Sequence, residues 1–241
     1  MVMNFKVELK IDWASHESAK YACEKWHYSE SLPVPPLVKI GVWEEKKFIG
    51  VILFSRGASS NLLKPYGLTQ TEGCELTRVA LTKHKTPVSR ILSIAFKFLK
   101  KNSPNLKLIV SFADPNENHH GGIYQATNWI YCGKSAKSFK YIDKSGREWH
   151  SRQVSEKGFN IQQGNIRKTV KPSECKKIEC EGKHRYLLPL TEEMKKKIII
   201  LSKPYPKRAS SRDNAATTDQ VVEGGVIPTD ALQLRDDDAI S

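Results

Sequence analysis

Residues 106–133, LKLIVSFADPNENHHGGIYQATNWIYCG, contain the pattern on which the predicted fold depends. The segment opens with an apolar, β-branched run at 106–110 that has the length of a buried strand. This strand is expected to end at 111–115, where polar side chains appear and Pro115 lacks an amide donor. A polar loop, two glycines, a helical pattern over 123–129 and a strand-like piece at 129–132 follow. This succession favours a functional site at the end of an α/β sheet.

The flanking residues predict the rest of the sheet and its helices. Alternating apolar residues predict a half-buried strand over 4–12, and Ser15 is a predicted N-cap for a helix that reaches about Tyr28. A hairpin is predicted at 39–55, and a long loop at 56–73 has the length that is typical of functional loops. A strand at 74–82, a helix at 88–101 that starts after Pro87, and a last strand at 183–190 complete the pattern.

This order of elements predicts an α/β fold with a mixed sheet flanked by helices. The order resembles that of the GCN5-related N-acetyltransferase fold. We expect an acyltransferase-like core over 1–133 and a basic extension over 134–208, which returns to the core with its final strand or strands at 182–190. Residues 209–241 have the composition of a disordered acidic tail.

The charge of the chain is strongly uneven. The net charge is +13, and residues 134–208 hold 20 Lys and Arg against 8 Asp and Glu. Such a basic segment indicates a polyanionic partner, most simply nucleic acid, although a solvated lysine-rich surface would look the same. Charge does not distinguish DNA from RNA. The basic residues singled out as DNA contacts are Lys64, Lys137, Lys140, Arg147 and Arg185.

Other totals exclude some classes of protein. No apolar run is long enough for a membrane-spanning helix, and the N-terminus lacks the apolar region of a signal peptide. The five cysteines are an odd number scattered along the chain, which is typical of reduced thiols. We therefore expect a cytoplasmic protein.

Polar residues gather at the predicted ends of three elements, in three groups: His27 and Tyr28; Glu75, Thr77 and Arg78; and Ser111, Asp114 and Tyr124. Arg78 lies among apolar neighbours, so its guanidinium requires a carboxylate or a ligand. Asp114 is the expected partner, because strands 74–82 and 106–112 should be neighbours. A purely structural pair is equally consistent with this pattern. His27 and Tyr28 are equally consistent with an aromatic plug at a helix end.

The turn before the helix at 88–101 is where acyltransferases of this fold bind the donor pyrophosphate through a glycine-rich loop. Residues 82–90, TKHKTPVSR, contain no glycine. The anion-binding candidates that remain are Lys83, Lys85, Ser89 and Arg90, together with the helix N-terminus.

Several segments together resemble the Mom family of Mu-like phages. They are WHYS at 26–29, ELTRVAL at 75–81, SRILSIAFKFLKK at 89–101, SFADPNENHHGGIYQATNWIYCG at 111–133, GKHRYLLPL at 182–190 and PYPKR at 204–208. The segments keep their order over roughly residues 20–208, and the segment at 111–133 is the most distinctive of them.

The resemblance implies a GCN5-related fold and a transferase that hypermodifies DNA. The exocyclic amine of adenine would become a carbamoylmethyl, glycinamide-like derivative that protects phage DNA from host restriction. The implied catalytic residues are Tyr28, Arg78, Asp114 and Tyr124, with Tyr124 at the usual place of a tyrosine acid. The implied donor is acetyl-CoA, and an implied iron would have Tyr28 and Asp114 as ligands. A phage-encoded protein of this kind would act in the cytoplasm of the host cell.

The expected mechanism combines the charge and the resemblance. The basic extension and loop 56–73 would hold the backbone of double-stranded DNA while the adenine leaves the stack. Trp26, Tyr28 or Tyr66 would stack on the flipped base, with His27 and Ser111 also in its binding site. Asp114 would orient or deprotonate the amine, and Arg78 would set its ionisation or hold the donor.

Two other functions remain open at this point. One is a conventional acetyltransferase that acts on protein, tRNA or a small amine. The other is a non-catalytic DNA-binding protein, which would leave Arg78 and Asp114 without a role.

Overall fold

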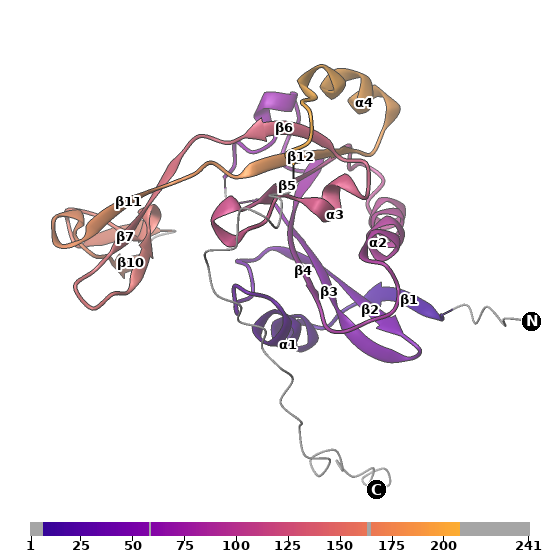
Figure 1. The fold of residues 1–241 in the computed structure, drawn as a ribbon, viewed down its shortest axis with the longest axis horizontal. Helices are drawn as coiled ribbons and strands as arrows, with labels where there is room; N and C mark the ends of the chain where they lie inside the picture. The colour runs from indigo at the N-terminus through magenta and orange to yellow at the C-terminus, as the bar shows by residue number, and fades with distance from the viewer. Residues whose placement is uncertain (1–6, 58, 163–164, 208–241) are drawn as a thin grey trace, which may run out of the picture. The chain divides into compact units, whose positions relative to one another are not determined.

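The computed structural model describes residues 7–57, 59–162 and 165–207. Within them the largest sheet has seven strands in the order β1-β2-β3-β4-β5-β12-β6 (Figure 1). Neighbouring strands are antiparallel except β4 and β5, which run parallel. The strands are β1 (Leu9–Trp13), β2 (Leu37–Glu44), β3 (Lys47–Ser55), β4 (Gly73–Leu81), β5 (Leu108–Ala113), β6 (Ile130–Lys134) and β12 (His184–Pro189). The mixed α/β sheet expected from the sequence is confirmed.

Helices cover both faces of this sheet, as the alternation of side chains along β3 shows. Val51 and Leu53 face one side, where they pack with Ala19 and Ala22 of α1 (His16–Trp26). Ile52 and Phe54 face the other side and pack with the buried face of α2 (Val88–Asn102). A short helix that the sequence did not predict, α4 (Glu192–Ile198), covers the Leu108, Val110 and Leu187 surface with Met194 and Ile198.

Local sequence sets the ends of α1 and α2. The Ser15 side chain accepts a hydrogen bond from the backbone N–H of Ser18, which confirms Ser15 as the N-cap of α1. The helix ends at Trp26 and the backbone of its C-cap, His27, is extended, so the WHYS segment begins at the last residue of the helix. Pro87 stands at the N-cap of α2, as the sequence predicts.

The strands β4 and β5 pair over a short distance and then separate. Their register joins Gly73, Cys74 and Glu75 to Leu108, Ile109 and Val110, and it ends there although both strands continue. One more link follows, in which the Ser111 hydroxyl donates to the carbonyl of Leu76 at 2.8 Å. The divergence beyond this point opens the sheet at the carboxyl ends of two parallel strands.

A β-bulge lies in β4 just past the divergence. Leu53 of β3 faces Arg78, whereas the next residue, Phe54, faces Leu76, so Thr77 is the extra residue. The Thr77 hydroxyl donates to the Leu53 carbonyl at 3.0 Å, which anchors the bulge.

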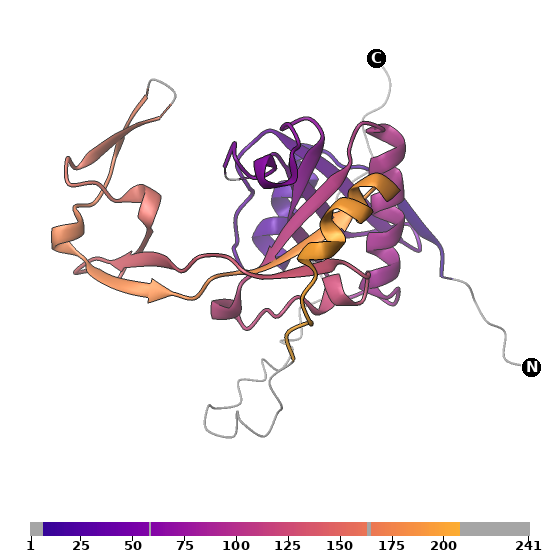
Figure 2. The ribbon, with the colours of Figure 1, turned by 90° about the horizontal axis from the view of Figure 1, so that it is seen from above.

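The basic segment between β6 and β12 forms its own small sheets (Figure 2), which we call the basic insertion (135–183). A three-stranded sheet has the order β11-β7-β8, and a separate hairpin joins β9 to β10. The strands are β7 (Ser138–Ile142), β8 (Glu148–His150), β9 (Phe159–Gln162), β10 (Asn165–Lys168) and β11 (Lys176–Cys180). Within the basic extension expected from the sequence, this part of the chain forms short antiparallel ribbons.

Some expectations fall outside the described residues: the first residues of the strand at 4–12 and the acidic tail at 209–241. Among the described helices, none has the length and apolarity needed to cross a bilayer. The five cysteines are free thiols in the structure.

Candidate active site

A cavity of about 430 Å³ lies where β4 and β5 diverge, within the size range of small-molecule sites. Its walls come from the end of α1, the bulged part of β4, the turn before α2, the end of β5 and the segment 118–124. It is lined by Trp26, His27, Tyr28, Thr77, Arg78, Val79, Leu81, His84, Val88, Phe112, Ala113, Asn118, His119, His120, Gly121, Gly122, Ile123 and Tyr124. None of these described lining residues is acidic, so the cavity favours an anionic or acceptor-rich ligand.

Arg78 is the main charge of the cavity. Its Nη1 donates to the backbone carbonyl of Thr77 at 2.8 Å, which folds the side chain back along the bulge. Its Nε is buried and has no hydrogen-bond partner. A buried N–H without an acceptor costs about 1–3 kcal/mol, so a ligand that brings an oxygen or ring nitrogen here gains that free energy.

The end of α1 contributes two aromatic rings with different exposure. His27 is half-buried, and its Nδ1 accepts the backbone N–H of Ser29 at 3.1 Å. Because that N–H can only donate, the neutral ring carries its proton on Nε2. Burial lowers the pKa of His27 to about 4, and Arg78 and His119 add to the effect, so His27 is neutral at pH 7. Tyr28 is 55% exposed, and its ring contacts those of His27 and His119.

Tyr124, which lines the cavity, forms a buried pair with Ser111, which lies behind it. The Ser111 hydroxyl lies 2.8 Å from both the Leu76 carbonyl and the Tyr124 hydroxyl. Since a carbonyl only accepts, Ser111 donates to Leu76 and the phenol of Tyr124 donates to Ser111. Burial raises the pKa of Tyr124 to about 12. The phenol oxygen therefore has lone pairs to offer a ligand, whereas its proton is already engaged.

The expected pairing of Asp114 with Arg78 is wrong. Asp114 makes a 2.7 Å salt bridge with Lys183 and accepts hydrogen bonds from the backbone and side-chain N–H of Asn116. Together these lower the pKa of Asp114 in spite of its partial burial. The physical reason lies in the register of β4 and β5, which pairs Glu75 with Val110. Continued in step, this register would set Arg78 opposite Ala113 and turn Asp114 to the other face of the sheet. Asp114 instead fixes the start of the loop that carries Asn118 and His119 into the cavity.

The segment 118–124, a loop that leads into the short helix α3 (Gly122–Gln125), requires glycine at one position. Gly121 has a φ of +83°, and a Cβ there would lie 2.3 Å from the ring of Tyr186. The Tyr186 hydroxyl donates to the His120 carbonyl at 2.5 Å, so the same tyrosine holds the loop from below. The distinctive segment at 111–133 thus builds one wall of the cavity.

His84 is a cavity residue that was not predicted from the sequence. It lies in the turn after β4, and its Nδ1 is 2.6 Å from the carbonyl of Thr82, to which it must donate. The Nε2 of the neutral ring is then a hydrogen-bond acceptor, the state that a general base needs. The sequence did not single out His84, because it lies in a turn rich in lysine. Its closeness in the sequence to the donor-binding candidates was the one signal that could have indicated a role.

Three of the residues predicted to contact DNA have buried side-chain atoms. Tyr66 is 3% exposed in the core with Leu63 and Met194, so it cannot stack on a base, and that expectation is wrong. Arg185 lies beside Tyr66, and its Nε is buried without a partner. Ser111 is fully buried behind the cavity wall.

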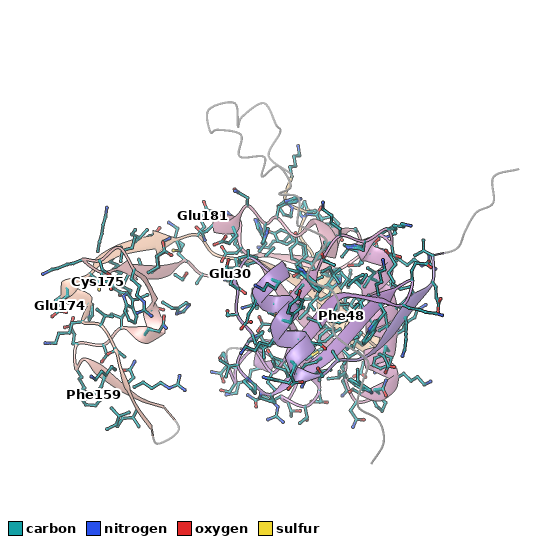
Figure 3. All side chains as sticks on the ribbon, turned by 90° about the horizontal axis from the view of Figure 1, so that it is seen from below. Glu30, Phe48, Phe159, Glu174, Cys175 and Glu181 are labelled. Atoms are coloured by element: carbon teal, nitrogen blue, oxygen red, sulfur yellow. The ribbon has the colours of Figure 1, made fainter. Side chains whose placement is uncertain are left out.

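The other basic candidates lie on the surface. Lys64 and Arg147 are exposed, and the Arg147 guanidinium stacks 4.3 Å from the ring of Trp149. Lys137 and Lys140 pair with Glu179 and Glu148, which lessens their charge. Figure 3 shows side chains of the insertion, with Phe159, Glu174 and Cys175 labelled.

The turn that would bind a CoA pyrophosphate already holds a carboxylate. Glu44, at the end of β2, is 7% exposed and accepts the backbone N–H groups of Lys85 and Thr86 at 2.8 and 2.7 Å. It also accepts the Thr86 hydroxyl at 2.6 Å. A pyrophosphate in this turn would have to displace Glu44 from these two amides, and Pro87 has no N–H to add. The residues present therefore do not fit CoA in the usual position. Glu44 already occupies the turn that contains or adjoins the predicted donor-binding residues Lys83, Lys85, Ser89 and Arg90.

The residues do not fit an iron centre of Tyr28 and Asp114 either. Tyr28 contacts two histidine rings, whereas Asp114 is engaged by Lys183 and Asn116. Among the described residues, no group of three or more His, Cys, Asp or Glu side chains has an arrangement that could hold a metal ion. The expected ligand pair is therefore corrected as well.

Known proteins resemble the chain at two levels. The methylcarbamoylase Mom of Escherichia phage Mu is 25% identical over 207 residues, covering 83% of this chain and 84% of that protein. Solved structures match more weakly: a Bacillus subtilis acetyltransferase in complex with CoA (12% identity, TM-score 0.40, 77% of this chain and 100% of that one), and FeeM, an N-acyl amino acid synthase from uncultured soil microbes (8%, 0.43, 78% and 94%). At these TM-scores the solved structures do not identify a function.

The sequence relationship is more decisive. The model of the Mom protein family matches residues 8–207, which include every element of the seven-stranded sheet and every wall of the cavity. The chain therefore belongs to the Mom protein family.

Proposed function

We propose that this chain modifies adenine in DNA, converting the exocyclic amine to a carbamoylmethyl derivative that shields phage DNA from host restriction. The observation that carries the proposal is the cavity between β4 and β5, where the unpartnered Nε of Arg78 meets the aromatic end of α1 in a member of the Mom family. The phage Mu relative is a methylcarbamoylase, which supports this choice of chemistry.

The aromatic residues are suited to holding a base. Tyr28 lines the cavity, and more than half of its surface is exposed. Its ring contacts the rings of His27 and His119, which hold it in place, so it can stack on an extrahelical adenine. The Nε2–H of neutral His27 is a donor for a ring nitrogen. The phenol oxygen of Tyr124 is an acceptor for the exocyclic N–H.

When the nitrogen of the amine displaces the leaving group of a carbamoylmethyl donor, the bond from carbon to the leaving group breaks as the new N–C bond forms, and the proton of the amine needs an acceptor. His84 is the residue we assign to this role, because its Nδ1–H is held by Thr82 and its Nε2 is left as an acceptor. Asp114, first expected in this role, positions the loop instead. Arg78 holds an anionic or carbonyl oxygen of the incoming group.

The cavity accepts one base, so a duplex must release its adenine first. The basic insertion supplies sequence-blind phosphate contacts for this step. Residues 135–183 carry 12 Lys and Arg against 6 Asp and Glu.

Mass spectrometry of nucleosides from cells that produce the chain tests the proposal. A new adenine nucleoside that carries a carbamoylmethyl group is the expected result. Unchanged nucleosides with tight DNA binding would make the chain a non-catalytic binding protein. Acetylation of amines without DNA would make it a conventional acetyltransferase, a function that the filled Glu44 turn disfavours.

A further inference from the structure

The basic insertion carries an exposed apolar pair that its charge does not explain. Ile161 of β9 and Ile166 of β10 are 69% and 72% exposed, and they face each other as cross-strand partners. Phe159 lies two residues before Ile161 on the same face and is 40% exposed. The three apolar residues form a stripe along one face of the hairpin.

Exposed isoleucines cost solubility and add nothing to the core, so a stripe of this kind marks a binding surface. Positive charge frames the stripe: Lys157, Arg167, Lys168 and Lys171 lie within residues 157–171, which contain no acidic residue. Arg167 is paired with Asn160 on the opposite face, and Lys168 with Phe159 on the apolar face. An apolar stripe inside a cluster of cations complements a duplex, whose stacked bases lie between two lines of phosphates.

We infer that the β9–β10 hairpin is a wedge that enters the DNA stack and opens the base pair of the target adenine. This inference rests on the proposed function and names a partner surface for it. A two-stranded ribbon fits the grooves of DNA, and apolar side chains that insert at a base step unstack it. Arg167 and Lys168 bind the flanking phosphates, while Ile161 and Ile166 take the place of stacked neighbours.

Permanganate oxidation of unpaired thymines tests the wedge, because the thymine opposite a flipped adenine becomes reactive. The full chain is mixed with an end-labelled duplex of a few hundred base pairs, which needs no group donor and includes many sequence contexts. The wild-type protein is expected to raise reactivity at discrete thymines. The double variant Ile161→Ala/Ile166→Ala is expected to return it to the level of free DNA, while the dissociation constant changes by about threefold or less, since phosphate contacts dominate affinity.

Two matched variants control this experiment. Ile200→Ala makes the same substitution at an isoleucine that is 85% exposed outside the insertion, and it should keep full reactivity. Arg167→Gln/Lys168→Gln should weaken binding and flatten its salt dependence, while the complexes that still form at low salt keep their reactive thymines.

Unchanged thymine reactivity in the isoleucine variant would overturn the inference. So would a loss of self-association in that variant, which would assign the stripe to a second copy of the chain. The proposed function is tested separately by nucleoside mass spectrometry: unmodified DNA from cells with the wild-type chain would refute the function and leave the permanganate result standing. Modification that persists in the double variant on duplex DNA would refute the wedge alone.

Discussion

Glu44 offers the sharpest perturbation of the site. Its carboxylate is buried and accepts three hydrogen bonds of 2.6–2.8 Å from Lys85 and Thr86. In Glu44→Ala the N–H and hydroxyl of Thr86, which is 3% exposed, are left without their acceptor, whereas water can satisfy the N–H of the exposed Lys85. At about 1–2 kcal/mol for each buried group, the free energy of unfolding should fall by about 2–4 kcal/mol. Glu44→Gln keeps one acceptor oxygen and should cost about half as much.

The effect should depend on pH in a defined direction. The hydrogen bonds from Thr86 and Lys85 outweigh desolvation and hold the pKa of Glu44 below its ordinary value of 4.5. A carboxyl group whose pKa is lower in the folded state stabilises the fold above the unfolded pKa, and this stabilisation is lost as pH falls through the folded pKa. The difference between wild type and Glu44→Gln should therefore be full at pH 7 and shrink below about pH 4.5.

Urea denaturation followed by circular dichroism at pH 7 and pH 4 measures both quantities. Glu24→Ala is the matched control, because Glu24 is an exposed glutamate that pairs with Lys20 at 3.8 Å, and it should change stability by less than about 0.5 kcal/mol. Equal stability of Glu44→Ala and Glu24→Ala would refute the reasoning about the filled turn.

The same geometry predicts the outcome of three other experiments. CoA at a hundredfold excess over a micromolar dissociation constant would stabilise a protein that binds it by about 2.7 kcal/mol. Because Glu44 occupies the turn, we expect no rise in the melting temperature of the wild-type chain; a clear rise would show that pyrophosphate displaces Glu44. Arg78→Ala should abolish DNA modification and leave DNA affinity unchanged, and Arg78→Lys should not restore it because lysine has no Nε–H of this geometry; full modification by Arg78→Ala in nucleoside analysis would remove Arg78 from the site. Lys144→Gln/Arg147→Gln should lower the slope of log affinity against log salt by about one unit for each phosphate that the variant no longer neutralises, measured by fluorescence anisotropy; an unchanged slope would place the phosphate-binding residues elsewhere.

The sheet and its main helices could be predicted because their signals are local. The period of two along β3 and the N-cap at Ser15 depend on near neighbours, so the positions of β2 to β6 and of α1 and α2 agree with the pattern. The helix α4 is only seven residues long and rich in lysine, so its apolar face rests on Met194 and Ile198 alone.

The partners within the site could not be predicted, since they depend on where strands separate. Asp114 and Arg78 follow the parallel segments of β5 and β4, but the register that pairs Glu75 with Val110 does not set them opposite each other. Glu44 reaches Thr86 across 42 residues, a contact that no local pattern encodes. The burial of Tyr66 could have been predicted, because the apolar residues Leu63 and Leu68 on either side of it indicate a buried segment.

If the cavity between β4 and β5 modifies the amine of adenine in DNA, the modification must depend on Arg78. Quantitative mass spectrometry of nucleosides tests this in cells that produce the wild-type chain, Arg78→Ala or Glu24→Ala at equal protein levels. We predict a carbamoylmethyl adenine nucleoside with wild type and Glu24→Ala and none with Arg78→Ala. Its absence with wild type, or equal amounts in all three, would contradict the proposed role of the cavity.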